Sequence, residues 1–292
     1  MRYIFFGTPR FAEIILDALL RADMPPIALV CNPDRPVGRK KIITAPETKK
    51  YIEKHGVSGH EKRITIFQPE ALDATFEKKL KDLRPDFFVV AAYAKIIPKS
   101  VLDIPKLGTL GIHPSLLPKY RGASPIQSSI LDGKKETGVT IFQVDEIADH
   151  GPLFAHRASR IANGETYLQL EEKLAKLGGD LLVKTVPKFI SGEIKSIAQD
   201  GGVATFTKKF RDEDGYVAPE DLKDAEAGGS SKAEIIFRKI RALNPEPGVW
   251  TMNNRKRLKL LEANIVNGAL KLTKIQEEGQ KPKMLLSVRS DR

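Results

Sequence analysis

The sequence predicts an α/β domain with a largely parallel sheet, followed by a smaller domain of short strands. Three features of the 292 residues lead to this expectation. Short apolar runs alternate with helical patterns through the first two thirds of the chain, the composition changes after Ile197, and several β-like runs separated by turn residues follow. We therefore expect a first domain over residues 1–202 and a second over residues 203–292.

In the first domain, continuous apolar runs predict buried strands, and apolar residues three and four positions apart predict helices. The expected strands are residues 3–6, 27–30, 87–92 and 137–144, and the expected helices are residues 11–20, 72–83 and 167–189. Strands that alternate with helices are joined by right-handed crossovers, which place neighbouring strands in parallel. The first domain should therefore be built on a mostly parallel sheet.

The second domain reads differently. Residues 212–231 are acidic and rich in glycine and serine, which predicts a linker or mobile loop. A helix is expected over residues 232–243, because Asn244-Pro245 stops the helical pattern there. The β-like runs that follow are residues 249–252, 257–263, 269–275 and 284–288. Short strands between turn signals predict a small β-barrel or sandwich.

Charge and cysteine content narrow the class of protein. Lys and Arg number 48 against 37 Asp and Glu, and the resulting net charge of +11 suits a polyanionic partner. The single cysteine, Cys31, excludes an intramolecular disulfide framework and indicates a reducing compartment. No apolar stretch approaches the roughly 20 residues that span a bilayer. We expect neither a secreted disulfide protein nor a membrane protein, and we expect Cys31 to serve packing.

The sequence gives little indication of a dinucleotide cofactor or a metal ion. The first strand ends in Gly7-Thr8-Pro9, which has one glycine where a dinucleotide-binding turn has three. That turn could hold an anion at the helix N-terminus or be a plain tight turn, and the sequence leaves both open. No metal is expected, because His55 and His60 are separated by Gly-Val-Ser-Gly and no Cys/His cluster exists.

The segment over residues 108–151 carries the most chemistry. His113 lies just past one strand-like run and Asp149 a few residues past another, so both are expected at the carboxyl ends of strands. A histidine oriented by a carboxylate is a common proton-transfer pair, because the anion stabilises the imidazolium. A surface histidine and a solvated aspartate fit the same spacing. Spacing alone leaves these alternatives open.

A longer motif goes further. The run HPSLLPKYRGASPIQ, followed by TGVTIFQVDE and then DHGP, resembles the signature of the 10-formyltetrahydrofolate-dependent formyltransferases. FGTP near the N-terminus and NPDRPVGR over residues 32–39 make the chain most similar to the methionyl-tRNA formyltransferases of that superfamily. The resemblance covers nearly the whole chain. It also includes Thr205-Phe206 and the run RALNPEPGVW.

The resemblance implies a fold and an activity. A Rossmann-like first domain would bind the folate, and a β-barrel-like second domain would help to hold tRNA. The enzyme would transfer the formyl group of 10-formyltetrahydrofolate, as a co-substrate, to the methionine amine of initiator methionyl-tRNA, for translation initiation. It would be cytoplasmic and a monomer, with no membrane association.

The catalytic set of the resembled family is an asparagine, a histidine two residues later and a downstream aspartate. His113 and Asp149 match the last two, but Gly111 stands at the asparagine position. Loss of one hydrogen-bond donor to a developing oxyanion typically costs about 10²–10³ in turnover. The chain is therefore either an enzyme of reduced rate, a catalytically impaired protein that binds tRNA or folate, or an N-formyltransferase of amino sugars on nucleotides. The NPDRPVGR run and the basic second domain argue against the third.

The resemblance also assigns binding residues. The expected folate contacts are Ser115, Leu116, Leu117 and Pro118, with Ala94 and Ile96 at the edge of the pterin pocket. The expected tRNA contacts are the basic residues Arg35, Arg39, Lys40, Lys41, Lys208, Lys209, Arg255 and Arg257. Each basic cluster alone is also consistent with a solvated surface. Phosphate contacts by Lys and Arg supply most of nucleic-acid affinity, which favours the tRNA interpretation of the three clusters together.

Overall fold

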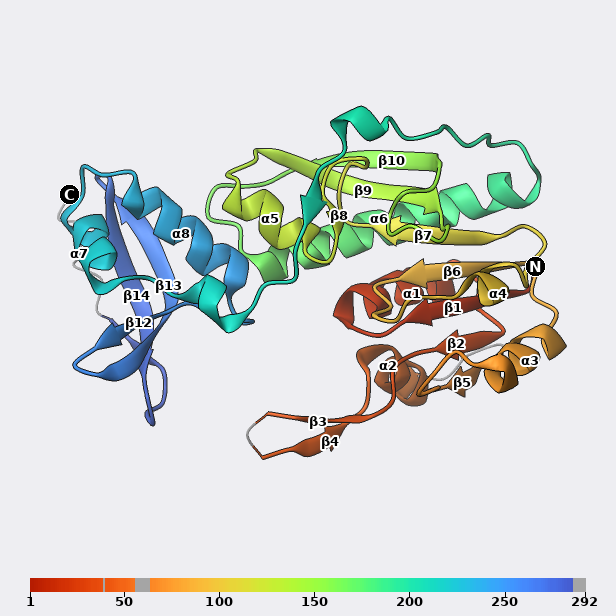
Figure 1. Cartoon of the computed structure of the whole chain (residues 1–292), viewed down its shortest axis with the longest axis horizontal. Coiled ribbons are helices and arrows are strands. Elements are labelled where there is room, and N and C mark those ends of the chain that lie inside the picture. The colour runs from red at the N-terminus through yellow and green to blue at the C-terminus, as the bar shows by residue number, and fades with distance from the viewer. Residues whose placement is uncertain (39, 56–63, 286–292) are drawn as a thin grey trace. The chain divides into compact units, whose positions relative to one another are not determined.

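The computed structural model describes residues 1–38, 40–55 and 64–285 (Figure 1). The chain forms two compact units. The first consists of Met1–Arg121, Gly138–Ser159 and Glu171–Phe206, and the second of Gly122–Thr137, Arg160–Leu170 and the chain from Thr207 onward. The last passage of the chain from the first unit to the second is between Phe206 and Thr207. The predicted domain boundary between residues 202 and 203 lies near this point and stays a prediction.

The large sheet lies mostly in the first unit. Within the described residues its seven strands run in the order β10-β9-β7-β6-β1-β2-β5. Their bounds are β1 Tyr3–Gly7, β2 Ala28–Val30, β5 Thr65–Phe67, β6 Phe87–Ala91, β7 Thr109–His113, β9 Glu136–Gln143 and β10 Leu153–Arg160. The pairs from β5 to β7 are parallel, and β9 pairs antiparallel to β7. The predicted mostly parallel sheet is confirmed, with β9 reversing direction next to β7.

Helices and a hairpin complete this part of the chain. They are α1 Arg10–Arg21, the hairpin β3 Arg35–Val37 and β4 Ile42–Thr44, α2 Glu47–His55, α3 Ala74–Asp82, α4 Lys99–Leu102 and α6 Tyr167–Ile190. In Figure 1, α6 runs alongside β7 and β9. A Cβ at Gly178 of α6 would lie 3.2 Å from Ile112 and 3.2 Å from Val139, so glycine lets this helix approach the two strands closely.

The central strands are buried because they are apolar on both faces. Every residue of β1 and β7 is buried. Tyr3 of β1 stacks on Phe87 of β6 with 5.0 Å between ring centroids, and Phe6 packs against Phe88 at 5.1 Å. Strands covered on both sides read as continuous hydrophobic runs, which is why their positions were predictable. This packing fixes the carboxyl ends of β6 and β7.

The second unit contains a small antiparallel sheet and, among the described residues, the helices α5, α7 and α8. The bounds of these elements are α5 Pro125–Leu131, α7 Pro219–Ala227, α8 Lys232–Leu243, β12 Trp250–Asn253, β13 Lys256–Val266, β14 Ala269–Glu277 and β15 Lys283–Met284. The strands pair in chain order, and α8 packs against β13 and β14 (Figure 1). The short strands β8 Arg121–Gly122 and β11 Phe206–Thr207 pair with each other. The predicted run at 284–288 lies partly outside the described residues.

The acidic stretch over residues 212–231 differs from the expected loop. It contains a short 3-10 helix, Asp212–Gly215, and the α-helix α7. Pro219 occupies the first turn of α7 together with two acidic residues, which suits the positive end of the helix dipole. Leu222 and Ala225 are buried, and Gly228 ends the helix at a φ of 85°. The helical pattern was hard to recognise in this glycine- and serine-rich stretch, because α7 buries only two residues.

No helix among the described residues has the length and apolarity needed to cross a membrane.

The buried thiol of Cys31 gives a first test of this packing. Burial raises the pKa of the thiol to about 12, and thiolate is the nucleophile in alkylation. We expect the folded protein to resist iodoacetamide at mildly alkaline pH and to react once unfolded in urea. Mass spectrometry of the alkylated protein measures both states. Rapid stoichiometric labelling of the native chain would contradict the burial.

Candidate active site

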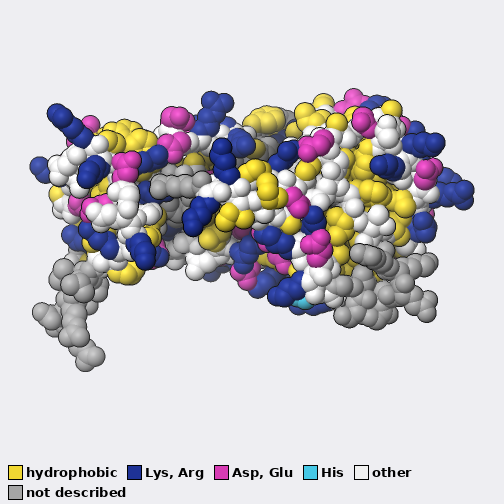
Figure 2. All heavy atoms as spheres, turned by 90° about the horizontal axis from the view of Figure 1, so that it is seen from below, with side chains coloured by type: hydrophobic (Ala, Val, Ile, Leu, Met, Phe, Trp, Pro, Cys, Tyr) yellow, Lys and Arg dark blue, Asp and Glu magenta, His cyan; other side chains and the backbone are white. Residues whose placement is uncertain are grey.

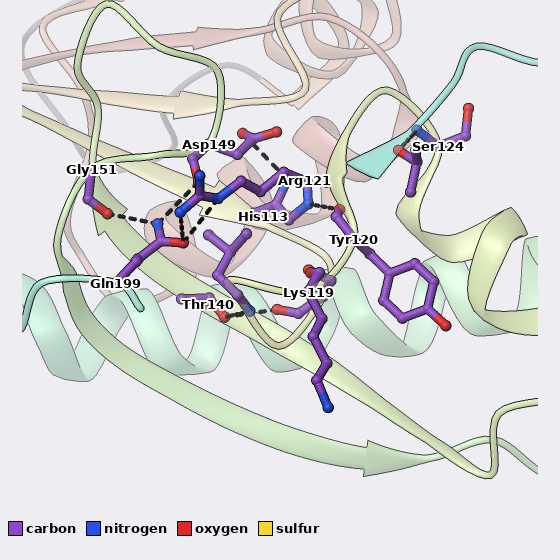
Figure 3. Close-up of polar contacts among 12 residues, drawn as sticks. His113, Lys119, Tyr120, Arg121, Ser124, Thr140, Asp149, Gly151 and Gln199 are labelled. Carbon is purple, nitrogen blue, oxygen red and sulfur yellow. Dashed lines mark hydrogen bonds and ion pairs between the residues drawn. The ribbon is translucent and has the colours of Figure 1, made fainter. Parts of the chain in front are cut away.

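His113 is the last residue of β7, and its backbone pairs with Thr140 on β9. Its side chain is 7% exposed, and each ring nitrogen faces an oxygen (Figure 3). Nε2 lies 2.8 Å from the carbonyl oxygen of Tyr120, and Nδ1 lies 3.5 Å from Oδ1 of Asp149. A carbonyl only accepts hydrogen bonds, so Nε2 carries the hydrogen. Nδ1 is therefore the ring nitrogen that faces the Asp149 carboxylate.

Asp149 reaches His113 from a turn with an unusual backbone. Its φ is 52°, in the left-handed region that non-glycine residues seldom adopt. The Nε2 of Gln199 donates to the carbonyl oxygens of Asp149 at 3.0 Å and Gly151 at 2.7 Å. A Cβ on Gly151 would lie 1.8 Å from the carbonyl oxygen of Gln143, so only glycine fits there. The turn after β9 is thus held on both sides, with its carboxylate facing Nδ1.

The carbonyl of Tyr120 is held in a similar way. Tyr120 has a φ of 61°, and its N–H donates to Oγ1 of Thr205 at 2.8 Å. The N–H of Arg121 donates to the carbonyl oxygen of Thr205 at 2.8 Å. Thr205 therefore binds two successive amides and fixes the peptide whose carbonyl accepts the Nε2 hydrogen of His113. The sequence motif included Thr205 without indicating this function.

Arg121 and Gln199 are two residues of the site that sequence reasoning missed. Arg121 is 4% exposed, and its Nε and Nη2 donate to Oε1 of Gln199 at 3.1 and 2.8 Å. In Figure 3 this pair lies next to His113 and Asp149. The only sequence signal was the position of Arg121 inside the HPSLLPKYRGASPIQ motif. A buried arginine needs polar partners, and that requirement could have pointed to it.

Gly111 lies on β7 two residues before His113 and pairs across the sheet with Phe142. A Cβ at Gly111 would lie 2.5 and 2.6 Å from two ring carbons of Phe142 and 2.9 Å from a methyl group of Val144. Phe142 is buried. The space that a larger residue would need at position 111 is thus filled by the Phe142 ring, and the site has an aromatic ring where a carboxamide was expected.

The predicted folate loop, Ser115 to Pro118, follows His113 directly. Ser115 is fully buried, and its hydroxyl donates to the carbonyl of Lys119 at 2.6 Å. The hydroxyl of Thr140 donates to the Ser115 carbonyl at 2.7 Å and accepts from the N–H of Leu117 at 3.1 Å. Ser115 and Thr140 therefore fasten the loop. Leu117 is buried, whereas Leu116 is only partly covered and lies against Gly138.

Ala94 and Ile96 follow β6 and face outward. Ile96 is 91% exposed, and Ala94 is also exposed. Between them, Nζ of Lys95 donates to the carbonyls of Pro69 and Glu70, which holds the segment in place.

A polar atom lies at the start of this segment. The Tyr93 hydroxyl is buried with no hydrogen-bond partner in the described parts of the chain, and burial raises its pKa to about 12. A buried hydroxyl without a partner is uncommon in folded proteins. Tyr93 packs against Phe6 with 5.5 Å between ring centroids, so its hydroxyl is enclosed in the protein while Ala94 and Ile96 are exposed.

The predicted tRNA residues of the first unit lie on the β3–β4 hairpin. Lys40 and Lys41 are exposed at its turn, Arg35 pairs with Glu70, and Arg39 lies outside the described residues. Ile42, next to Lys41, is 62% exposed. The hairpin thus presents basic and apolar side chains together.

The predicted basic residues of the second unit differ in availability. Lys209 and Arg255 are exposed, while Lys208 pairs with Asp214. The Arg257 guanidinium lies 3.9 Å from the centre of the Trp250 ring, and Nη2 donates to Asp212 at 2.5 Å. Arg257 is therefore already engaged within the chain. Figure 2 shows Lys and Arg more densely than Asp and Glu over the face in view, interspersed with apolar groups.

The structure brings His113, Asp149 and the fastened loop together and places Gly111 on the same strand as His113. The predicted basic residues come from separate elements of the two units. Across residues 1–38, 40–55 and 64–285, no group of three or more His, Cys, Asp or Glu side chains is placed to hold a metal ion.

Comparison with known proteins identifies related sequences and structures. The chain matches the family model for formyl transferase over residues 1–186 and that for the formyl transferase C-terminal domain over residues 230–281. The methionyl-tRNA formyltransferase of Staphylococcus epidermidis is 40% identical over 268 residues, which are 91% of this chain and 81% of the relative.

Two solved structures share the fold. One is methionyl-tRNA formyltransferase from Clostridium thermocellum, with a TM-score of 0.60 and 19% identity over 95% of this chain and 98% of that one. The other is the N-formyltransferase from Helicobacter canadensis in complex with folinic acid and dTDP-3-aminofucose, with a TM-score of 0.62 and 17% identity over 91% of this chain and 88% of that one. The family match covers more than half of the chain, and the chain belongs to the formyl transferase family.

Proposed function

We propose that this protein transfers the formyl group of 10-formyltetrahydrofolate to the amino group of methionine on initiator methionyl-tRNA. The observation that carries this proposal is the His113–Asp149 pair, held at the ends of β7 and β9 in a chain closely similar to a methionyl-tRNA formyltransferase. Bound 10-formyltetrahydrofolate supplies the carbon that the amine attacks.

His113 moves the proton in this reaction. An amine that attacks a formyl carbon must lose a proton, and the departing folate nitrogen must gain one. Nδ1 of His113 faces Asp149, so it accepts a proton while the carboxylate stabilises the imidazolium. The protonated ring also stabilises negative charge that develops on the formyl oxygen. Nε2 keeps its hydrogen on the Tyr120 carbonyl throughout, which holds the ring in one orientation.

The folate would lie between the fastened loop and the segment after β6. We assign its apolar contacts to Leu116, Leu117, Pro118, Ala94 and Ile96. Exposure of Ala94 and Ile96 supports this assignment. Ser115 contributes by holding the loop, since its own hydroxyl is buried and donates to Lys119.

The tRNA would bind through the exposed basic residues on the β3–β4 hairpin and in the second unit. Lys40, Lys41, Lys209 and Arg255 are exposed, and we place them on phosphates. We also propose phosphate contacts for Arg35 and Arg39. Lys208 and Arg257 would contact phosphates once they exchange their acidic partners, Asp214 and Asp212, for the tRNA. A tRNA substrate places the enzyme in the cytoplasm, and we propose that it acts as a monomer.

The first prediction concerns His113. Incubation of the protein with 10-formyltetrahydrofolate and initiator methionyl-tRNA should yield formylmethionyl-tRNA, measured by chromatography of the released amino acid. The His113→Ala variant should lose about 10²–10⁴ in kcat, as expected for removal of a general acid-base group, with its tRNA affinity unchanged. His156→Ala, an exposed histidine on β10, is the matched control. Equal rates in both variants would overturn the assigned role, and formylation of a nucleotide-linked amino sugar alone would overturn the substrate.

The second prediction concerns Gly111. Asn at position 111 has no room beside Phe142, so Gly111→Asn alone should destabilise the fold by about 1–3 kcal/mol and should not raise kcat. With Phe142→Ala, the amide gains space, and the double variant should be more stable than the sum of the single effects predicts. Its kcat should exceed that of Phe142→Ala. Urea unfolding and the formylation assay measure these quantities, and a fully stable Gly111→Asn single variant would contradict the packing.

The third prediction concerns the hairpin. Reversing two exposed charges with Lys40→Glu and Lys41→Glu should raise the KM for tRNA, leave the KM for the folate unchanged, and reduce the dependence of tRNA binding on salt. Lys78→Glu combined with Lys106→Glu, two exposed lysines outside the predicted tRNA set, makes the same change in net charge and is the control. An equal effect from the control would assign the loss to overall charge and remove the hairpin from the tRNA path.

A further inference from the structure

We propose that Gln199 is a positioning residue for formyl transfer, whose side chain holds Asp149 beside Nδ1 of His113 while Arg121 holds Gln199. The residue touches neither proton-transfer group with its own polar atoms, since it binds backbone carbonyls and a guanidinium. The catalytic part of this inference rests on the proposed function. The structural part stands on the contacts alone.

All the hydrogen-bonding capacity of the Gln199 carboxamide is used. Its two N–H groups go to the carbonyls of Asp149 and Gly151, and its oxygen accepts two bonds from Arg121 (Figure 3). A primary amide has two donor hydrogens and two acceptor lone pairs, so all four are satisfied. Turning the amide over would set N–H against guanidinium and oxygen against two carbonyls. The orientation is therefore fixed by chemistry.

The turn that Gln199 holds needs such support. Asp149 adopts a φ of 52°, and a residue in this region costs of order 1–3 kcal/mol unless its surroundings enforce it. The two bonds from Gln199 bracket that residue, at its own carbonyl and at that of Gly151. Without them the peptide could relax toward a common conformation, and the carboxylate would then leave Nδ1.

Arg121 connects this turn to the other partner of His113. Its side chain binds Gln199, and its own peptide nitrogen follows the Tyr120 carbonyl that accepts from Nε2. The contacts therefore form a closed ring from Nδ1 through Asp149, Gln199, Arg121 and Tyr120 back to Nε2. Gln199 joins the two halves of this ring. One substitution there should disturb both partners of the imidazole.

The test uses two variants with different chemistry. Gln199→Glu keeps an acceptor for Arg121 but sets an oxygen against the two carbonyls, and Gln199→Leu removes all four bonds at similar size. We expect each to lower kcat about tenfold to a hundredfold, as for a small misplacement of a catalytic group, with both KM values nearly unchanged. Gln276→Glu, whose Nε2 binds the Gln280 carbonyl on the second unit, is the matched control and should retain full activity.

A double-mutant cycle separates positioning from general support of the fold. Asp149→Asn removes the carboxylate that Gln199 positions. In that background, Gln199→Leu should cost little further kcat, because both changes act through the same group. Independent, fully additive losses would overturn the proposal, and so would a loss confined to KM.

Hydrogen exchange supplies a readout that needs no turnover. Gln199→Leu should speed amide exchange in the peptide covering residues 145–152, with little change in peptides from β1 and β6. Unchanged exchange in that peptide would overturn the structural part of the inference. A wild-type protein that is inactive but shows the expected exchange pattern would overturn the proposed function. The inference that Gln199 holds the Asp149 turn would still be supported, so the two failures are distinguishable.

Discussion

The hydrogen bond from Nε2 of His113 to the Tyr120 carbonyl is the contact on which the rest of the site depends. It fixes the tautomer, turns Nδ1 toward Asp149 and leaves that nitrogen for the proposed proton exchange. The β7–β9 pairing positions the site, because it brings His113 opposite Thr140 and starts the Asp149 turn nearby. The Thr140 hydroxyl fastens the loop after His113, so His113 and the proposed folate contacts share one anchor.

Local sequence patterns were sufficient to predict the central strands of the large sheet. Buried parallel strands are continuous apolar runs, so β1 and β6 could be located, and the strand-like run before His113 indicated that this residue lies near a strand end. The functions of Tyr120 and Gln199 could not be located, because they depend on contacts between distant parts of the chain. Gln199 binds the Asp149 turn from 50 residues away. Helix α7 was missed for a different reason, since its short apolar face lies in an acidic, glycine-rich stretch.

The interpretation of Gly111 changes once its contact with Phe142 is known. From sequence it is a missing carboxamide, and a single replacement would be the natural repair. In the structure it is one half of a packed pair, because the Phe142 ring occupies the space beside it. The two residues have to be considered together, because a larger side chain at position 111 needs a smaller one at position 142 on the neighbouring antiparallel strand. A side chain at position 111 therefore requires the Phe142 ring to move.

The positive φ angles at Asp149 and Tyr120 bear on the stability of the molecule as well as on its site. Both partners of the imidazole sit in backbone conformations that an unconstrained chain avoids, so the folded state gives up free energy on either side of His113. Substitutions that relaxed these turns would raise the melting temperature and weaken the proposed proton transfer. Selection for heat resistance alone would thus act against the proposed catalytic geometry, because stability and turnover make opposite demands on these two turns.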